Sequence, residues 1–142
     1  MFRGEINHTV DAKGRVIIPA KFRDQLGDKF VITKGLDECL FIFPAKEWGE
    51  FEAKVAALPI SDKSARRFVR TYIGAAFDAE IDQMGRTIIP QNLREYAKVS
   101  KEAVLVGAIN RLELWSVESW KDYNLKGAED EDAAEKMAQF GI

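Results

Sequence analysis

Residues 11–26 read DAKGRVIIPAKFRDQL, and residues 82–97 read DQMGRTIIPQNLREYA. The two stretches lie 71 residues apart and are identical at seven of sixteen aligned positions. The similarity continues from 30–35 to 103–107 and from 40–43 to 112–115. The chain is therefore a tandem duplication of a unit of about 50 residues, and two copies are too few for a solenoid. We expect the copies to pair around one pseudo-twofold axis.

Each copy predicts the order β-β-α-β-β. In the first copy the β-branched and apolar runs predict strands over 5–10, 15–18, 30–33 and 40–43, with a two-turn helix over 20–26. The second copy predicts strands over 77–81, 86–89, 103–106 and 112–115. Gly14 suits the positive φ of a tight turn, and Pro19 suits the start of a helix.

One unit cannot close a core by itself. Four short strands would leave edges exposed and the apolar faces of Ile17 and Ile18 only half covered. We therefore predict a mixed α+β fold in which the two units interlock into one β-barrel. The expected organisation is a first unit at 5–46, a linking helical pair at 47–76, a second unit at 77–124 and an acidic tail at 125–142.

The linking segment shows helical periodicity in two parts. Residues 47–58 place Trp48, Phe51 and Val55 on one stripe. Residues 62–76 form the second predicted helix, with Ser61 as its candidate N-cap. The two helices predict a central helical hairpin.

The composition indicates a soluble globular protein and excludes several other classes of protein. It has 142 residues, 46% hydrophobic and 31% charged, which is typical of one soluble globular domain. A single cysteine, Cys39, excludes an intrachain disulfide, and a single histidine, His8, excludes a two-histidine metal site. No apolar run is long enough to cross a bilayer, and no secretory signal is visible. We expect a cytoplasmic protein without a membrane partner.

Charge is unevenly distributed along the chain. The net charge is −2, so the whole chain lacks the basic excess of many nucleic-acid-binding proteins. Residues 1–26 nevertheless carry five basic residues against three acids, and residues 63–70 carry four basic residues and no acid. From Glu118 onward the chain carries seven acids against three lysines, so an acidic tail offsets the positive charge of the rest of the chain.

The doubled motif resembles a known family. Asp11 to Arg15 followed by Val16 to Pro19 is similar to the AbrB-like DNA-binding domains with a swapped-hairpin barrel. Two such units in one chain that opens Met1-Phe2-Arg3-Gly4 resemble the MraZ family of bacterial transcriptional regulators. The resemblance covers the chain up to about Lys126. It implies two interlocked hairpins and a ring-shaped homo-oligomer on tandem DNA repeats. The implied target lies upstream of the division and cell-wall gene cluster that includes the regulator's own gene.

The candidate DNA-binding residues are Arg15, Arg86 and Lys13. In each copy an aspartate and an arginine bracket the turn, and the resemblance places the family's motif on these two pairs. An arginine fork matches the O6 and N7 atoms of guanine or a phosphate, whereas a lysine gives a phosphate contact that does not depend on sequence. The turn-fixing candidates are Asp11, Asp82, Gly14 and Gly85. The alternative is that both pairs only staple the turn, at about 0–1 kcal/mol each.

Several further basic residues are candidates for secondary DNA contacts: Arg3, Lys21, Arg23 and Arg94. For Arg23 and Arg94 we favour an ion pair with an acid of the other unit. For the basic stripe at Lys63, Arg66, Arg67 and Arg70 we favour ion pairs across helices or between subunits. An exposed solvated face and a DNA contact are the alternatives. The aromatic residues exceed what a small barrel can cover. They suggest a subunit interface, with Arg66, Arg67, Trp48 and Phe51 as candidates, and the alternative is packing between the two linking helices of one chain.

No catalytic constellation is visible. The sequence has no phosphate-binding glycine loop, no nucleophile elbow and no metal-ligand spacing, and Cys39 lies in an apolar run. We expect no enzyme activity, no cofactor, no metal and no small-molecule substrate. The leading prediction is a DNA-binding transcriptional regulator that forms a ring and associates with the nucleoid. We expect it to act as a repressor. The alternatives are a ring-forming protein scaffold and an antitoxin-like DNA binder with a toxin-binding tail.

Overall fold

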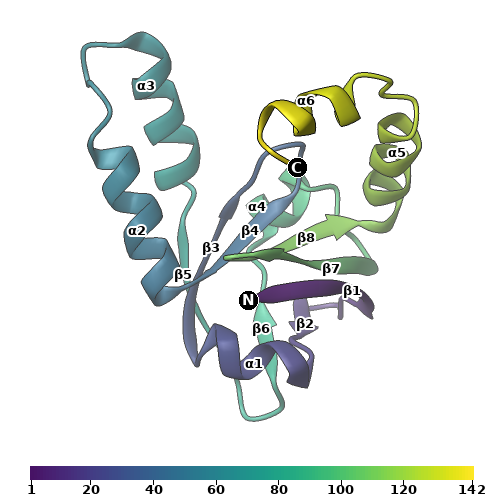
Figure 1. Cartoon of the computed structure of the whole chain (residues 1–142). Coiled ribbons are helices and arrows are strands. Elements are labelled where there is room, and N and C mark those ends of the chain that lie inside the picture. Colours follow the sequence, from purple (N-terminus) through teal and green to yellow (C-terminus); the bar gives the residue numbers. More distant parts are fainter.

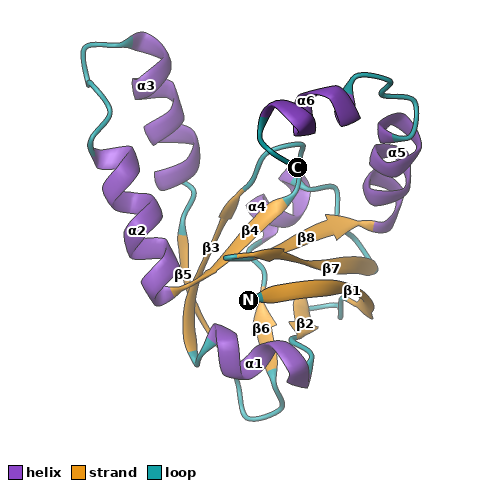
Figure 2. Ribbon diagram, viewed as in Figure 1, coloured by secondary structure: helices purple, strands orange, loops and turns teal.

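The computed structural model describes all 142 residues. Pairs of strands are followed by one or more helices along the whole chain (Figures 1 and 2). The order is β1 (Phe2–Thr9), β2 (Arg15–Ile17), α1 (Ala20–Leu26), β3 (Lys29–Lys34), β4 (Leu40–Pro44), α2 (Ala45–Ala56), α3 (Lys63–Phe68), a π-helical turn η1 (Val69–Ile73), β5 (Phe77–Glu80), β6 (Arg86–Ile88), α4 (Gln91–Tyr96), β7 (Glu102–Ile109), β8 (Leu112–Ser116), α5 (Val117–Gly127) and α6 (Ala133–Gln139). The predicted mixed α+β class is confirmed.

Strands of the two halves pair with each other. The main sheet has six antiparallel strands in the order β1-β7-β8-β4-β3-β5, and β2 and β6 form a separate two-stranded ribbon. The first strand of each half therefore pairs with the third strand of the other half, as β1 with β7 and β5 with β3. An isolated bridge between Val10 and Val16 joins β1 to the ribbon. This pairing does not close into one ring of strands, and the barrel remains a prediction.

β1 and β7 are longer than the sequence predicts. They pair over eight residues each, from Phe2 opposite Ile109 to Thr9 opposite Glu102. A Cβ on Gly107 would lie 2.3 Å from the backbone nitrogen of Arg3, so a glycine is needed where these strands meet. Strand length here follows from the partner strand of the other half, which local composition does not reveal.

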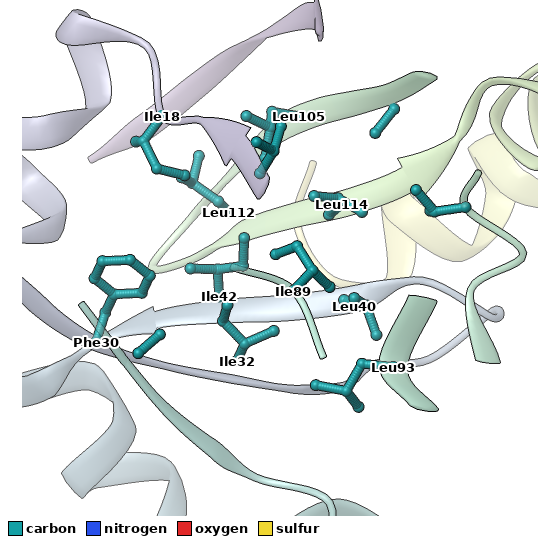
Figure 3. Packing of buried hydrophobic residues seen from close by; sticks show 14 of the residues in the cluster. Ile18, Phe30, Ile32, Leu40, Ile42, Ile89, Leu93, Leu105, Leu112 and Leu114 are labelled. Carbon is teal, nitrogen blue, oxygen red and sulfur yellow. The ribbon is translucent and has the colours of Figure 1, made fainter. Parts of the chain in front are cut away.

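The core draws on both halves. Nineteen buried apolar residues form one cluster, including Ile18 and Ile89, which occupy equivalent places in the two copies (Figure 3). Backbone bonds reinforce this exchange, because Ile18 N donates to Gly85 O at 2.9 Å and Ile89 N donates to Gly14 O at 2.8 Å. Each turn glycine therefore holds the strand end of the other half.

The linking helices form an arm that extends from the sheet (Figure 1). Phe51 stacks on Phe43 with ring centroids 5.1 Å apart and lies 6.4 Å from Phe68, so the arm is tied to β4. The predicted N-cap at Ser61 is wrong: the side chain of Asp62 accepts the bond from Ala65 N at 2.8 Å. The predicted second helix, 62–76, is shorter in the structure and ends in a π-helical turn, where Gly74 N donates to Val69 O.

The tail beyond Lys126 is helical in part. α5 packs on β8 through Trp120 and Tyr123, whose rings lie 5.2 and 4.9 Å from that of Trp115. α6 buries none of its residues. None of the helices has the length and apolar character needed to traverse a bilayer.

Candidate nucleic-acid interface

Asp11 organises the first turn with both of its carboxylate oxygens. Oδ1 accepts the backbone N–H groups of Lys13 and Arg15, each at 2.9 Å, and Oδ2 accepts Nε of Arg15 at 2.7 Å. Gly14 N closes the turn by donating to Asp11 O, and Gly14 adopts a φ of +81°, which a residue with a Cβ rarely adopts. One carboxylate therefore fixes both the backbone of the turn and the direction of the arginine.

The second copy repeats this arrangement. Oδ1 of Asp82 accepts from Met84 N and Arg86 N at 2.9 Å, and Oδ2 accepts Nε of Arg86 at 2.8 Å. Gly85 has a φ of +77°. Asp11 and Asp82 and the two glycines therefore adopt the same turn geometry in both halves. An isolated surface ion pair would not need to conserve this geometry between copies.

The turn lowers the pKa of both aspartates. For Asp11 the largest cause is the bond from the backbone N–H of Arg15, with further contributions from the Arg15 side chain and Lys13 N. For Asp82 the corresponding causes are Arg86 N, the Arg86 side chain and Met84 N, so its pKa also lies below 3.8. Both carboxylates are ionised at neutral pH and can hold their arginines in place.

Arg15 and Arg86 lie on one face of the β2–β6 ribbon. Arg15 is opposite Ile88 and Ile17 is opposite Arg86, which makes the two arginines diagonal neighbours. Diagonal neighbours in an antiparallel pair have Cα atoms roughly 7–8 Å apart. Only Nε of each guanidinium has a partner within the chain, and the side chains are 30% and 24% exposed. The ribbon therefore presents two guanidinium groups whose Nη1 and Nη2 atoms are free for a ligand.

Two isoleucines share this face, although no motif in the sequence assigns them a function. Ile17 and Ile88 are 39% and 47% exposed, whereas Val16 and Thr87, on the other face of the ribbon, are buried. The signal is the alternation of the strand: a surface residue at position 15 places position 17 on the same face. The candidate face is thus an apolar strip with two arginines, rather than a purely basic patch.

Arg23 and Arg94 support the turn of the opposite half. Nε of Arg23 donates to Ile18 O at 2.7 Å, and Nε of Arg94 donates to Ile89 O at 2.8 Å. The expected ion pair with an acid of the other unit is wrong, since neither arginine has a carboxylate partner. A Cβ on Gly14 would lie 2.7 Å from the guanidinium of Arg94, and Arg23 covers Gly85 in the same way. A backbone carbonyl, rather than a carboxylate, therefore accepts the hydrogen bond from each Nε.

The remaining basic candidates lie mainly in the first half. Lys13 is exposed in the first turn, and Met84 occupies the equivalent place in the second. Arg3 and Lys21 line a common hollow of about 330 Å³, and the Lys21 ammonium lies 4.8 Å from the centre of the Phe22 ring. None of the turn residues lines that hollow.

The interface candidates lie on the helical arm. Trp48 and Phe51 pack against Phe43 and are half-buried in their own chain. Arg66 donates Nη1 to the carbonyls of Ile60 and Ser61, and Arg67 has no hydrogen-bond or ion-pair partner. The ion pairs across helices that the sequence allowed are absent, because no acid of α2 reaches the basic stripe.

Comparison with known proteins identifies the family of the chain. The family model described as "MraZ protein, putative antitoxin-like" matches residues 1–71 and again residues 72–141. The chain belongs to the MraZ family. The two matches divide the chain between the two halves that exchange strands, so the duplication read from Asp11–Leu26 and Asp82–Ala97 extends over the whole chain.

Full-length relatives carry the family name. The transcriptional regulator MraZ of Carboxydothermus hydrogenoformans is 54% identical over 141 residues, which cover 99% of both chains. Those of Clostridium tetani and Halothermothrix orenii are 49% and 53% identical, over 100% of both chains. At this level of identity and coverage, the MraZ family assignment covers the ribbon, the arm and the C-terminal helices together.

Proposed function

We propose that the chain is a sequence-specific DNA-binding transcriptional regulator that reads DNA with the β2–β6 ribbon. The observation that carries this proposal is the pair of guanidinium groups on one face, each held through Nε by a turn aspartate and free at Nη1 and Nη2. Membership in a family whose relatives are named transcriptional regulators supports it.

The chemistry of the two arginines fits base recognition. The major groove of B-DNA admits a two-stranded β-ribbon, and an arginine fork binds O6 and N7 of guanine with two parallel bonds. Because Asp11 and Asp82 already fix the two side chains, little rotamer freedom remains to be lost on binding. Ile17 and Ile88 each lie beside both arginines on the same face of the ribbon and can contact thymine methyl groups. Lys13 adds a phosphate contact in the first half.

A single module with two arginines reads few base pairs, so assembly is part of the proposal. We propose that the halves form a swapped-hairpin barrel and that copies join into a ring-shaped homo-oligomer. Such a ring would present several ribbons to tandem DNA repeats, at multiples of about 34–36 Å for one helical turn. Linked sites raise the total affinity without any new contact. The proposed sites lie upstream of the division and cell-wall gene cluster, which includes its own gene, and the protein would act on the nucleoid as a repressor.

The test is a titration of the Arg15→Ala and Arg86→Ala variants with the DNA upstream of the protein's own gene and with a shuffled fragment. Each loss of a bidentate base contact should cost about 1–3 kcal/mol on the upstream fragment and much less on the shuffled one. Lys13→Ala should weaken both fragments alike and reduce the salt slope by about one unit. Lys121→Ala, at an exposed lysine of α5 that forms no ion pair, is the control.

Two outcomes would contradict the proposal. Unchanged affinity of both arginine variants would remove the ribbon as the reading surface. A salt slope near zero for the unsubstituted protein would favour a scaffold that binds protein partners, because neutralising phosphates always releases counterions.

A further inference from the structure

The C-terminal segment presents apolar side chains that its own chain leaves uncovered. Met137, Phe140 and Ile142 are 42%, 74% and 91% exposed. The helical spacing places Ala133, Met137 and Phe140 on one face of α6 and its cap. This is an unpartnered apolar face at the end of the chain.

An acidic run precedes this face. The segment 128–142 contains five acidic residues and one lysine, and four of the acids are consecutive, Glu129 to Asp132. None of them forms an ion pair, and the one side-chain bond in the run links Asp132 N to Asp130 Oδ1. The segment thus combines an apolar face with unpaired negative charge.

The helical arm has the complementary surface. A hollow of about 270 Å³ lies on the arm, where α2, α3 and the start of η1 meet. Its lining includes the apolar residues Val55, Leu58, Ile60 and Val69 and the basic residues Arg66 and Arg70. Ile60 is 83% exposed, although Nη1 of Arg66 holds the loop that carries it through the carbonyls of Ile60 and Ser61. An apolar side chain is thus held in solvent by a fixed loop.

The basic stripe beside the hollow lacks acidic partners. Lys63, Arg66, Arg67 and Arg70 follow one another at i, i+3, i+4 and i+7 on one side of the helix, and none forms an ion pair. The charge of the stripe is opposite to that of the acidic run. Apolar character and charge therefore match between the arm and the C-terminal segment.

We propose that residues 128–142 of one copy dock on the α2–α3 arm of a second copy. Phe140 and Met137 would enter the hollow, and Glu129 to Asp132 would face the basic stripe. A cavity of about 150 Å³ accommodates a benzene ring, so the hollow has room for the Phe140 ring and part of Met137. The proposal specifies the surface of the self-association in the proposed function, and it does not depend on DNA binding.

The geometry of one copy favours an occupant from another. Packing of Trp120 and Tyr123 on Trp115 fixes α5, and only five residues separate α5 from α6. Five extended residues span at most about 18 Å. In Figure 1 the arm and α6 project from the sheet as separate bodies, with β3 and β4 between them. Within a ring, by contrast, each copy can offer its segment to the next.

A charge-exchange experiment on the full chain tests this docking. Arg67→Glu with Arg70→Glu, or Asp130→Lys with Asp132→Lys, should each weaken self-association about tenfold or more at low salt, because like charges then face each other. All four substitutions in one chain should restore it. The mass distribution from sedimentation velocity is the measurement.

Two comparisons make the exchange specific. Lys101→Glu with Lys121→Glu, two exposed lysines without ion pairs, is the matched control and should leave the mass unchanged. Binding of each variant to a single-repeat DNA fragment is measured in parallel. Loss of assembly with retained DNA binding supports the docking alone, and loss of DNA binding with retained assembly counts against the proposed function alone. Failure of the four-fold variant to regain the unsubstituted mass would overturn the docking.

Cross-linking shows whether the C-terminal segment in the hollow belongs to the same copy or to a second copy. Copies with Ile60→Cys are mixed with copies with Phe140→Cys and oxidised; Cys39 is fully buried and does not compete. A disulfide-linked pair of the two variants is expected, and Phe140→Ser mixed with Ile60→Cys is the control. A chain that carries both cysteines and forms only an internal disulfide would show that each copy covers its own arm, contrary to the proposal.

Discussion

Replacing Asp11 with asparagine separates the two tasks of this residue. The asparagine Oδ1 can still accept the N–H groups of Lys13 and Arg15, which hold the turn. Its Nδ2 then faces Nε of Arg15, so that two donors meet where a carboxylate accepted a bond of 2.7 Å. The turn is retained, and the guanidinium is released.

The magnitudes predict a specific pattern. The ion pair is 30% and 37% exposed, so its loss should change the free energy of unfolding by no more than about 1 kcal/mol. Ordering a released arginine on binding costs about 0.5–1.5 kcal/mol, or roughly 2- to 13-fold in affinity for the cognate fragment. Removing one negative charge about 8 Å from a phosphate adds about 0.5 kcal/mol of affinity for every DNA alike. The ratio of specific to non-specific affinity therefore isolates the ordering of Arg15.

Fluorescence anisotropy with the upstream and the shuffled fragments, at two salt concentrations, measures this ratio. We expect it to fall roughly 2- to 13-fold for Asp11→Asn. Asp24→Asn removes an exposed charge of α1 that has no bonded partner, and it should raise both affinities together. If Asp11→Asn behaves like Asp24→Asn, the carboxylate does not preorganise the arginine, and this reasoning is refuted.

Three other predictions concern the scaffold. Gly14→Ala should lower the free energy of unfolding in urea by about 1–3 kcal/mol, because Gly14 has a positive φ and the guanidinium of Arg94 lies next to it. Gly49→Ala in α2 is the contrast: the added Cβ meets no atom within 4 Å, and the free energy of unfolding should rise by about 0.5–1 kcal/mol. Thr87→Val should raise the free energy of unfolding by about 1 kcal/mol, because Thr87 Oγ1 is buried without a hydrogen-bond partner and the first copy has Val16 at the equivalent position. A variant of equal or lower stability would contradict this prediction. Asp82 should titrate below 3.8 in carboxyl NMR, so that its contribution to stability is full above pH 3.8 and is lost as the pH falls through the lower folded value; a midpoint at or above 3.8 would contradict this.

The sequence determined most of the local structure because the duplicated motif uses local chemistry. The aspartate, the glycine and the arginine of each turn bond within five residues, and their roles follow from spacing alone. The alternation of Arg15 and Val16 also determines which side of the ribbon faces the core. Pairing of β2 with β6 then follows from the expected pseudo-twofold axis.

Features that depend on contacts between distant residues were not predictable in the same way. An arginine one turn into a helix suggests an ion pair, but Arg23 lies over a glycine of the other half and bonds to a carbonyl, which no local pattern encodes. The predicted N-cap is Ser61, one residue before the observed cap at Asp62. Serine and aspartate are both favourable N-cap types, so residue type alone does not decide which of them reaches Ala65 N. The helicity of α6 lies in a segment whose composition indicates mainly charge.

The two halves share a scaffold but differ where they would meet DNA. Arg15 and Arg86 are equivalent, whereas Lys13 faces solvent in one turn and Met84, 67% exposed, in the other. An exactly symmetric pair would read a palindrome and could not distinguish its two orientations. With a phosphate-binding lysine on one side only, each ribbon would have a preferred direction along the duplex. A ring of such ribbons, all oriented alike, matches direct tandem repeats better than inverted ones. Met84→Lys would make the two half-sites equivalent, and we expect it to reduce the preference for direct over inverted repeats in a competition titration.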